Sequence, residues 1–105
     1  MGSAARQRSK RLAEKLLWVR TALGLSQNGL IRHLGLEAEM FQGRISSYEL
    51  GTREPPLPVL LAYARAANVY VDALIDDDLD LPEKLPASPK SEGIRRKKSY
   101  RSKKS

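Results

Sequence analysis

Few residues of this chain combine into a group that could carry out catalytic or metal chemistry. His33 is the only histidine and cysteine is absent, so a metal ion or a nucleophile would lack its usual neighbouring ligands or base. The acidic run 76–80, DDDLD, matches the first acidic positions of a calcium-binding loop, but Leu81 replaces its glycine and Ala87 its closing glutamate. We therefore interpret His33 as a surface residue and the run as a solvated acidic cap.

Acid–base catalysis by two carboxylates, such as Glu14 and Glu83, is equally poorly supported by the sequence. No glycine-rich phosphate-binding loop, nucleophile motif or apolar substrate pocket accompanies these residues. The sequence predicts neither an enzyme nor a bound metal or cofactor.

The segment 41–50, FQGRISSYEL, differs from its neighbours because it is helical in pattern yet strongly polar. Only Phe41, Ile45 and Tyr48, with the aliphatic part of Glu49, are spaced to point inward. The other side chains are mostly amides, hydroxyls and a guanidinium, all of which form hydrogen bonds. Such a helix is typical of a surface that a partner molecule reads.

The apolar spacing predicts an all-α fold of five short helices, since no segment alternates apolar and polar residues as a strand does. The expected helices cover residues 8–23, 27–34, 41–50, 58–67 and 71–75. Their expected ends are Gly24, the N-cap Ser26, Gly35, Gly51 and the left-handed Asn68. Their expected inward residues, besides those of 41–50, are Leu12, Leu16, Val19, Leu23, Leu30, Ile31, Leu34, Leu60, Leu61, Ala64 and Ala67.

The net charge of +7 is concentrated at the C-terminal end of the chain. Residues 1–86 contain 11 basic and 11 acidic residues, whereas residues 87–105 contain 8 basic and 1 acidic. This composition predicts a flexible N-terminus (1–7), a folded domain (8–80) and a disordered Pro/Ser/Lys-rich basic tail (81–105). The tail could either solubilise the protein or bind the phosphates of a nucleic acid.

Membrane insertion is not expected from this sequence. The longest apolar run, 59–64, is far too short to cross a bilayer, and no apolar signal segment follows the basic N-terminus. Together with the absence of cysteine, this favours a cytoplasmic protein.

Three segments, GLSQNGLIRHLG (24–35), RISSYELGTREPP (44–56) and VLLAYARAANVYVDALI (59–75), follow one another along the chain. In this order they resemble the XRE-type helix-turn-helix domain of the phage Cro/repressor class, over residues 12–75. The resemblance implies a λ-repressor-like five-helix bundle. It also implies that helix 41–50 lies in the major groove of double-stranded DNA and that helix 27–34 supports it.

The resemblance also assigns roles to individual residues. Arg44 would pair with guanine and Gln42 with adenine, while Gln27 and Arg53 would contact the DNA backbone. Ile45 would anchor the helix in the core, and Glu49 would meet Arg20. The implied DNA-contacting residues are Gln27, Asn28, Gln42, Gly43, Arg44, Ser46, Ser47 and Arg53.

The chain departs from the family pattern in three places. Residues 36–39, LEAE, lengthen the turn before helix 41–50 and add two acidic side chains. Ile31 stands where the family usually has a small residue. Leu17, Trp18 and Leu23 occupy positions that are often charged.

These observations predict a sequence-specific DNA-binding transcriptional regulator, repressor-like and homodimeric. The expected dimer surface is Tyr63 and Tyr70 with helix 71–75, and the second candidate is Leu17 with Trp18. Three alternatives stay open: an adaptor that binds another protein through these surfaces, an antitoxin that also masks a toxin, and an RNA-associated protein that uses the tail.

Overall fold

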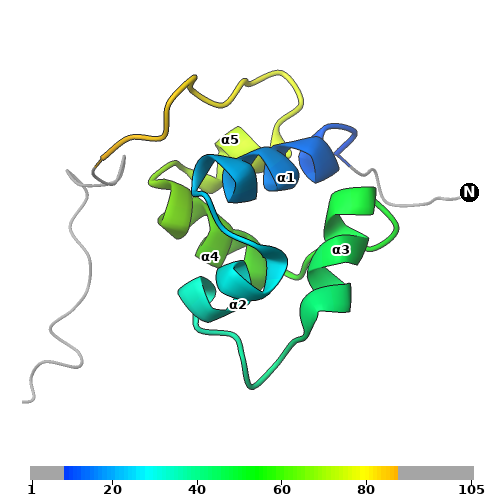
Figure 1. Ribbon diagram of the computed structural model, residues 1–105. Coiled ribbons are helices and arrows are strands. Elements are labelled where there is room, and N and C mark those ends of the chain that lie inside the picture. The colour runs from blue at the N-terminus through cyan, green and yellow to red at the C-terminus, as the bar shows by residue number, and fades with distance from the viewer. Residues whose placement is uncertain (1–8, 88–105) are drawn as a thin grey trace, which may run out of the picture.

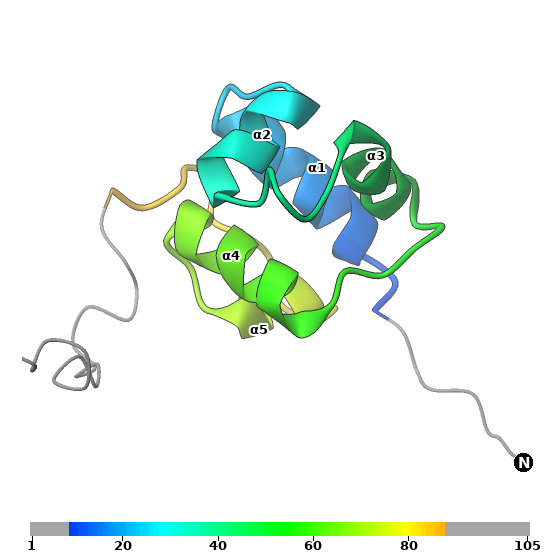
Figure 2. The same ribbon diagram turned by 90° about the horizontal axis from the view of Figure 1, so that it is seen from below.

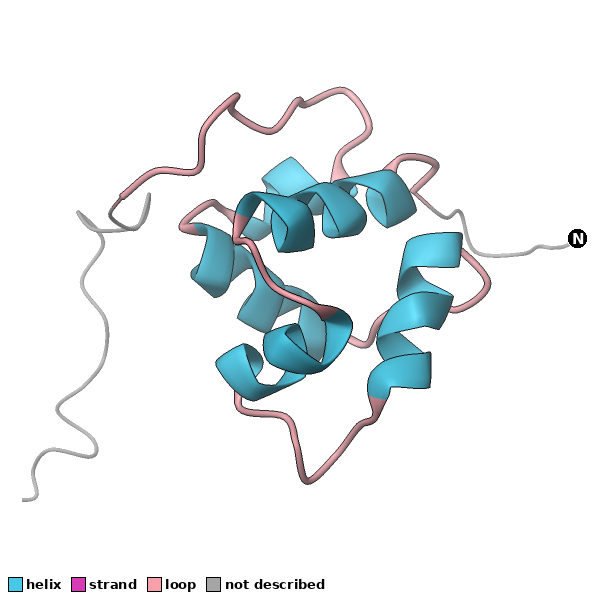
Figure 3. Cartoon of the chain, in the orientation of Figure 1, coloured by secondary structure: helices cyan, strands magenta, loops and turns pink. Residues whose placement is uncertain are grey.

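Residues 9–87, the part of the chain that the computed structural model describes, form five helices joined by short turns and a non-helical segment that follows the last helix (Figure 1). They are α1 (Leu12–Ala22), α2 (Gln27–Leu34), α3 (Gln42–Leu50), α4 (Leu57–Ala67) and α5 (Val71–Ile75). Within residues 9–87 there is no strand, which confirms the all-α prediction for this part (Figure 3). The predictions for residues 1–7 and for the tail beyond residue 87 fall outside the described range.

The helices surround a small core to which each of them contributes. Helix α1 packs against α3, α4 and α5, while α2 contacts both α3 and α4, as the view from below shows (Figure 2). The buried apolar side chains are Leu12, Leu16, Val19, Leu30, Ile31, Ile45, Tyr48, Val59, Leu60, Tyr63, Ala64, Ala67, Val69 and Leu74. Ile45 is fully buried, so α3 is anchored by the residue that the sequence predicts.

Helix ends follow local chemistry closely. The Ser26 hydroxyl accepts a hydrogen bond from the backbone N–H of Gly29 at 2.9 Å and so caps α2. Gly35 and Gly51 end α2 and α3 in the left-handed conformation, with φ of 73° and 79°. Asn68 ends α4 in the same way, with φ of 60°. These four predicted caps are confirmed.

The predicted burial or exposure of three residues is wrong. Phe41 is 67% exposed, because as the N-cap of α3 it has an extended backbone that turns its side chain away from the core. Leu61 is 39% exposed and lies one turn after the exposed Leu57, on the outer side of α4. Tyr63, predicted as a dimer surface, is completely buried, since it shares the inner side of α4 with Leu60.

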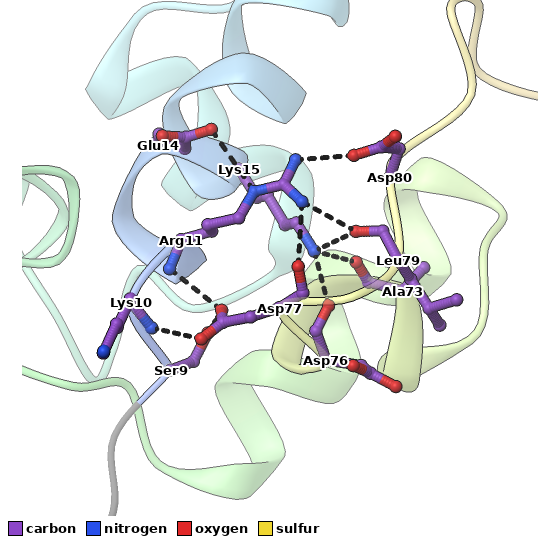
Figure 4. Close-up of polar contacts among 10 residues, drawn as sticks. All are labelled: Ser9, Lys10, Arg11, Glu14, Lys15, Ala73, Asp76, Asp77, Leu79 and Asp80. Atoms are coloured by element: carbon purple, nitrogen blue, oxygen red, sulfur yellow. Dashed lines mark hydrogen bonds and ion pairs between the residues drawn. The ribbon is translucent and has the colours of Figure 1, made fainter.

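Three helix starts also differ from the prediction. Helix α1 begins at Leu12 rather than at residue 8, α3 at Gln42 rather than at Phe41, and α4 at Leu57 rather than at Pro58. Residues 9–11 are held by a segment that is distant in the sequence. The Asp77 carboxylate accepts hydrogen bonds from the Ser9 hydroxyl (2.7 Å) and from the backbone N–H groups of Lys10 (2.8 Å) and Arg11 (3.0 Å) (Figure 4).

The acidic run after α5 is therefore part of the fold and not only a solvated cap. Arg11 donates to the backbone carbonyls of Asp77 and Leu79 and forms an ion pair with Asp80 at 2.8 Å. A carboxylate at the N-terminal end of α1 also interacts favourably with the helix dipole. Together these contacts attach the start of α1 to the segment that follows α5.

The buried Lys15 also connects α1 to the segment that follows α5. Only 3% of the residue is exposed, and burial lowers the pKa of its ammonium group. Its Nζ donates to the carbonyl oxygens of Ala73 (2.9 Å), Asp76 (2.9 Å) and Leu79 (2.7 Å) (Figure 4). Because an ammonium group carries three protons, each proton has its own acceptor, and the buried charge is fully solvated by the protein.

Residues 81–87, which the sequence assigns to the tail, lie against the folded body. Leu81 and Leu85 pack on the core, and the Asn68 side chain donates to the Pro86 carbonyl at 2.8 Å. The folded part of the chain therefore extends beyond the predicted boundary at residue 80. None of the helices in residues 9–87 has the length and apolar content needed to cross a membrane.

Replacing Lys15 by Met should destabilise the fold, because it keeps the aliphatic stem but leaves three carbonyl groups without their donor. We expect the free energy of unfolding to fall by about 1–3 kcal/mol. Urea denaturation followed by circular dichroism would measure it. The matched control is Lys10→Met, which removes the same charge from an exposed side chain. Equal stability of the two variants would contradict the role assigned to Lys15.

The Asp77 contacts should make stability depend on pH. Hydrogen bonds from the backbone of Lys10, the hydroxyl of Ser9 and the backbone of Arg11 lower the pKa of Asp77 from 3.8 to about 2. A carboxylate whose pKa is lowered by folding stabilises the protein above its unfolded pKa. That stability is lost as the pH falls from about 4 to 2.

In Asp77→Asn the fold should be weaker at neutral pH, and the loss of stability between about pH 4 and pH 2 should be shallower than in the parent. Urea midpoints measured across this range would give the slope. Asp78→Asn, at an exposed neighbouring position, should keep the slope of the parent. An unchanged slope in Asp77→Asn would show that this carboxylate is not coupled to folding.

Candidate functional site

The outward face of α3 is polar and built from small residues. Successive residues of an α-helix are rotated by about 100°, so Gly43 and Ser47 lie opposite the buried Ile45. Gln42 and Ser46 flank this face on one side and Arg44 flanks it on the other. Its centre carries only a glycine and a serine, and the ring of the exposed Phe41 lies over the glycine.

An ion pair between α1 and α3 lies behind this face. Arg20 Nε is 2.6 Å from Glu49 Oε2, and its Nη2 is 3.1 Å from Oε1. The side chains are only 18% and 7% exposed, and the hydrogen bond from Arg20 to Glu49 raises the pKa of the guanidinium. Arg20 also donates to the Leu25 carbonyl at 3.0 Å. The predicted pairing of Arg20 with Glu49 is confirmed.

A series of hydrogen-bonded side-chain amides connects this ion pair to the protein surface. Gln27 Nε2 donates to Glu49 Oε1 at 3.0 Å, and Gln27 Oε1 accepts from Gln42 Nε2 at 3.2 Å. Gln42 Oε1 in turn lies 3.5 Å from Asn28 Nδ2. Three predicted contact residues are thus brought together where α2 and α3 begin.

The ion pair fixes which way these amides point. A carboxylate can only accept hydrogen bonds, so Gln27 must turn its NH₂ group toward Glu49 and its oxygen toward Gln42. Gln42 must then turn its NH₂ group toward Gln27 and its oxygen toward Asn28. The buried charge thereby sets the direction of an exposed amide at the first residue of α3.

Arg44 and Arg53 lie on the other side of α3. Both line a groove of about 440 Å³, together with Tyr48, Glu54, Pro55, Pro56, Leu57 and Leu60. The turn that carries Arg53 is closed on α3, because the Ser47 carbonyl accepts from the backbone N–H groups of Thr52 (3.0 Å) and Arg53 (3.3 Å). The Thr52 hydroxyl also donates to this carbonyl at 3.3 Å.

The lengthened turn between α2 and α3 loops out from the body (Figure 1) but is anchored at its two ends. Leu36 and Met40 are half-buried against the core, and the backbone N–H groups of Glu39 and Met40 both donate to the Leu36 carbonyl at 3.0 Å. Glu37 and Glu39 are exposed. The additional residues thus form a folded turn that leads directly into Phe41 and α3.

The predicted contact residues consequently form two groups on either side of one face. Gln27, Asn28 and Gln42 are hydrogen-bonded to one another, whereas Arg44 and Arg53 share the groove. Gly43, Ser46 and Ser47 lie on α3 between these groups. His33 is exposed on α2. Within residues 9–87, no cluster of three or more His, Asp or Glu side chains could hold a metal ion.

Sequence reasoning missed three residues of this region. Thr52 closes the turn after α3, and its position directly after the C-cap Gly51 is the only signal that could have indicated this role. Leu50 and Phe41 are both strongly exposed at the two ends of α3. The helical pattern gives no signal for Phe41, because its spacing to Ile45 and Tyr48 is that of a buried stripe.

Comparisons of the chain with models of protein families, with curated proteins and with solved structures found no match. What the chain does must therefore be inferred from its own residues and geometry.

The ion pair behind α3 should be essential to stability. Glu49→Ala leaves the buried Arg20 charge unpaired, and we expect the free energy of unfolding to fall by about 3–5 kcal/mol. Glu14→Ala is the matched control, because Glu14 is 70% exposed and its ion pair with Arg11 is a surface contact. That control should cost less than about 1 kcal/mol.

A double variant, Arg20→Met with Glu49→Leu, separates the charge from the packing. It should be more stable than Glu49→Ala alone, since no buried charge is then left without a partner. Chemical denaturation of all variants would measure these differences. If Glu49→Ala unfolded at the same denaturant concentration as Glu14→Ala, the ion pair would not hold α3 in place.

Proposed function

We propose that the chain is a sequence-specific DNA-binding protein with a λ-repressor-like helix-turn-helix domain. In this proposal α3 enters the major groove of double-stranded DNA and α2 lies against the backbone. The observation that carries it is the outward face of α3, where hydrogen-bonding side chains flank a small-residue centre. A helix with such a face fits the width of the major groove, and its N-terminal residues come closest to the base edges.

The side chains at the edges of this face match the groups that bases present. Gln42 can form paired hydrogen bonds with adenine, and Arg44 can form them with guanine. Because the hydrogen bond with Gln27 holds the Gln42 amide in one orientation, less side-chain entropy is lost on binding. Arg53, in the turn after α3, is suited to a phosphate contact.

The distribution of charge in residues 9–87 gives this proposal no separate support. Residues 9–87 contain 11 acidic residues, and 7 of them belong to α1, to α5 and to the segment 76–83. Helix α5 packs on α1 and α4. The other four, Glu37, Glu39, Glu49 and Glu54, lie in α3 or beside its ends, where the basic residues are Arg44 and Arg53.

A repressor-like regulator that binds DNA as a homodimer is part of this proposal. The dimer surface cannot include Tyr63, which is buried. Exposed apolar side chains are available at the two ends of α5, Tyr70 and Ile75, and along α4, Leu57 and Leu61. Leu17 on α1 is also exposed.

An adaptor that binds another protein is the second candidate function. The observation that favours it is the exposure of Leu50 and Leu57, one at the end of α3 and the other at the start of α4. Leu57 lines the groove that Arg44 and Arg53 share, and Leu50 lies between these two arginines in the sequence. A protein partner would use such apolar side chains, whereas sequence-selective DNA binding would depend mainly on Gln42 and Arg44.

Selection of the full chain's preferred sites from random duplexes, followed by binding measurements on variants, tests the proposal. Gln42→Ala and Arg44→Ala should each weaken binding to the selected site by about 1–3 kcal/mol and relax the base preference at one position. Arg65→Ala is the matched control, since it removes the same charge from an exposed position on α4. It should leave the base preference unchanged.

Two results would contradict the proposal. The first is that no preferred sequence emerges from the selection. The second is that Gln42→Ala and Arg44→Ala bind every duplex as the parent does, which would favour the adaptor function.

A further inference from the structure

Phe41 is an exposed aromatic side chain at the start of α3, and its position is defined by its neighbours. As the N-cap it has an extended backbone, with φ of −128° and ψ of 172°. The ring lies over Gly43: a Cβ atom on Gly43 would be only 2.8 Å from Phe41 Cε2 and 3.4 Å from Cδ2. The ring therefore covers the N-terminal part of the outward face of α3 instead of entering the core.

Gly43 is what allows this arrangement. Its conformation is helical, so a glycine is not needed there for the backbone. Any larger residue would push the phenyl ring away from α3, because contacts near 2.8 Å are not found between carbon atoms in proteins. The glycine thus leaves room for the ring of Phe41, which is next in sequence to Gln42, whose amide is oriented by Gln27.

We propose that Phe41 contacts the C5-methyl group of a thymine in the major groove, beside the base that Gln42 reads. This inference rests on the proposed DNA-binding function and names one element of the preferred sequence. The N-terminal end of a recognition helix comes nearest to the base edges, and Phe41 and Gln42 occupy that end of α3.

The chemistry of the ring selects the thymine. A phenyl ring has no hydrogen-bonding group, so it would cover the polar edges of guanine, cytosine or adenine without compensating for their lost water. The thymine methyl is the apolar group that the four bases present in the major groove. If Gln42 pairs with adenine, a thymine methyl is available in that same base pair.

Replacing each thymine of the selected site by deoxyuridine, one at a time, tests the inference with the full chain. This change removes the methyl group and leaves the base pairing intact. The parent protein should lose about fourfold in affinity at one thymine, which is the value of one buried methyl-sized group. Phe41→Ala should bind the thymine duplex more weakly and should no longer distinguish thymine from deoxyuridine at that position.

The matched control is Leu79→Ala, which truncates an exposed apolar side chain (39% exposed) in the segment that follows α5. It should remain as sensitive to deoxyuridine as the parent. Gly43→Ala should reduce this sensitivity, because it displaces the ring without removing it. Since both Phe41 and Gly43 are exposed, circular dichroism should show that their variants fold as the parent does.

Several outcomes would overturn the inference. They are a selected site without thymine, a parent protein insensitive to deoxyuridine at every position, or a Phe41→Ala variant as sensitive as the parent. A loss of self-association in Phe41→Ala with unchanged thymine preference would assign the ring to contact with a second copy. In each case selective binding that depends on Gln42 and Arg44 would leave the proposed function standing. Absence of any selective binding would overturn both.

Discussion

The ion pair between Arg20 and Glu49 is the interaction on which the arrangement of α1, α2 and α3 depends. Burying two charges is costly unless each is paired and its remaining hydrogen-bonding groups are satisfied. Here Arg20 also binds the Leu25 carbonyl in the turn before α2, and Glu49 also binds Gln27 at the start of α2. Satisfying these charges therefore requires the three helices to meet at one point, and the same requirement orients the exposed Gln42 amide.

Helix α1 is fixed at two places by charged groups, which matters in a core of this size. Toward its C-terminal end Arg20 attaches it to α3. At its other end Lys15 donates to three carbonyls around the end of α5, and Asp77 binds the residues that precede α1. A small domain buries limited apolar surface and has little stability in reserve. Hydrogen bonds from buried or half-buried charges therefore contribute substantially to holding α1 between α3 and α5.

Features decided by neighbouring residues were predictable from the sequence. The bounds of α2 and α5 and the caps at Gly35, Gly51 and Asn68 follow from local chemistry, and the resemblance supplied the pairing of Arg20 with Glu49. The start of α1 was missed because Asp77, which holds residues 9–11, lies more than 60 residues away in the sequence. Phe41 was predicted to be buried because the helical spacing was extended to include it. Its backbone is extended rather than helical, so that spacing does not apply to its side chain.

Hydrogen bonds within α3 also limit which base atoms its outward face could bind in the proposed complex. The Ser47 hydroxyl donates its proton to the Gly43 carbonyl at 3.0 Å, within the helix itself. A hydroxyl has one proton but two lone pairs, so in this state Ser47 can only accept hydrogen bonds from a partner. In the proposed complex it would therefore favour the amino groups of adenine or cytosine over the acceptor atoms of guanine or thymine. The hydrogen bonds donated to base acceptor atoms would then come from the longer side chains at the edges of the face, above all Arg44. The small side chain of Ser47 would let this part of the helix approach closely enough for those longer side chains to reach the bases.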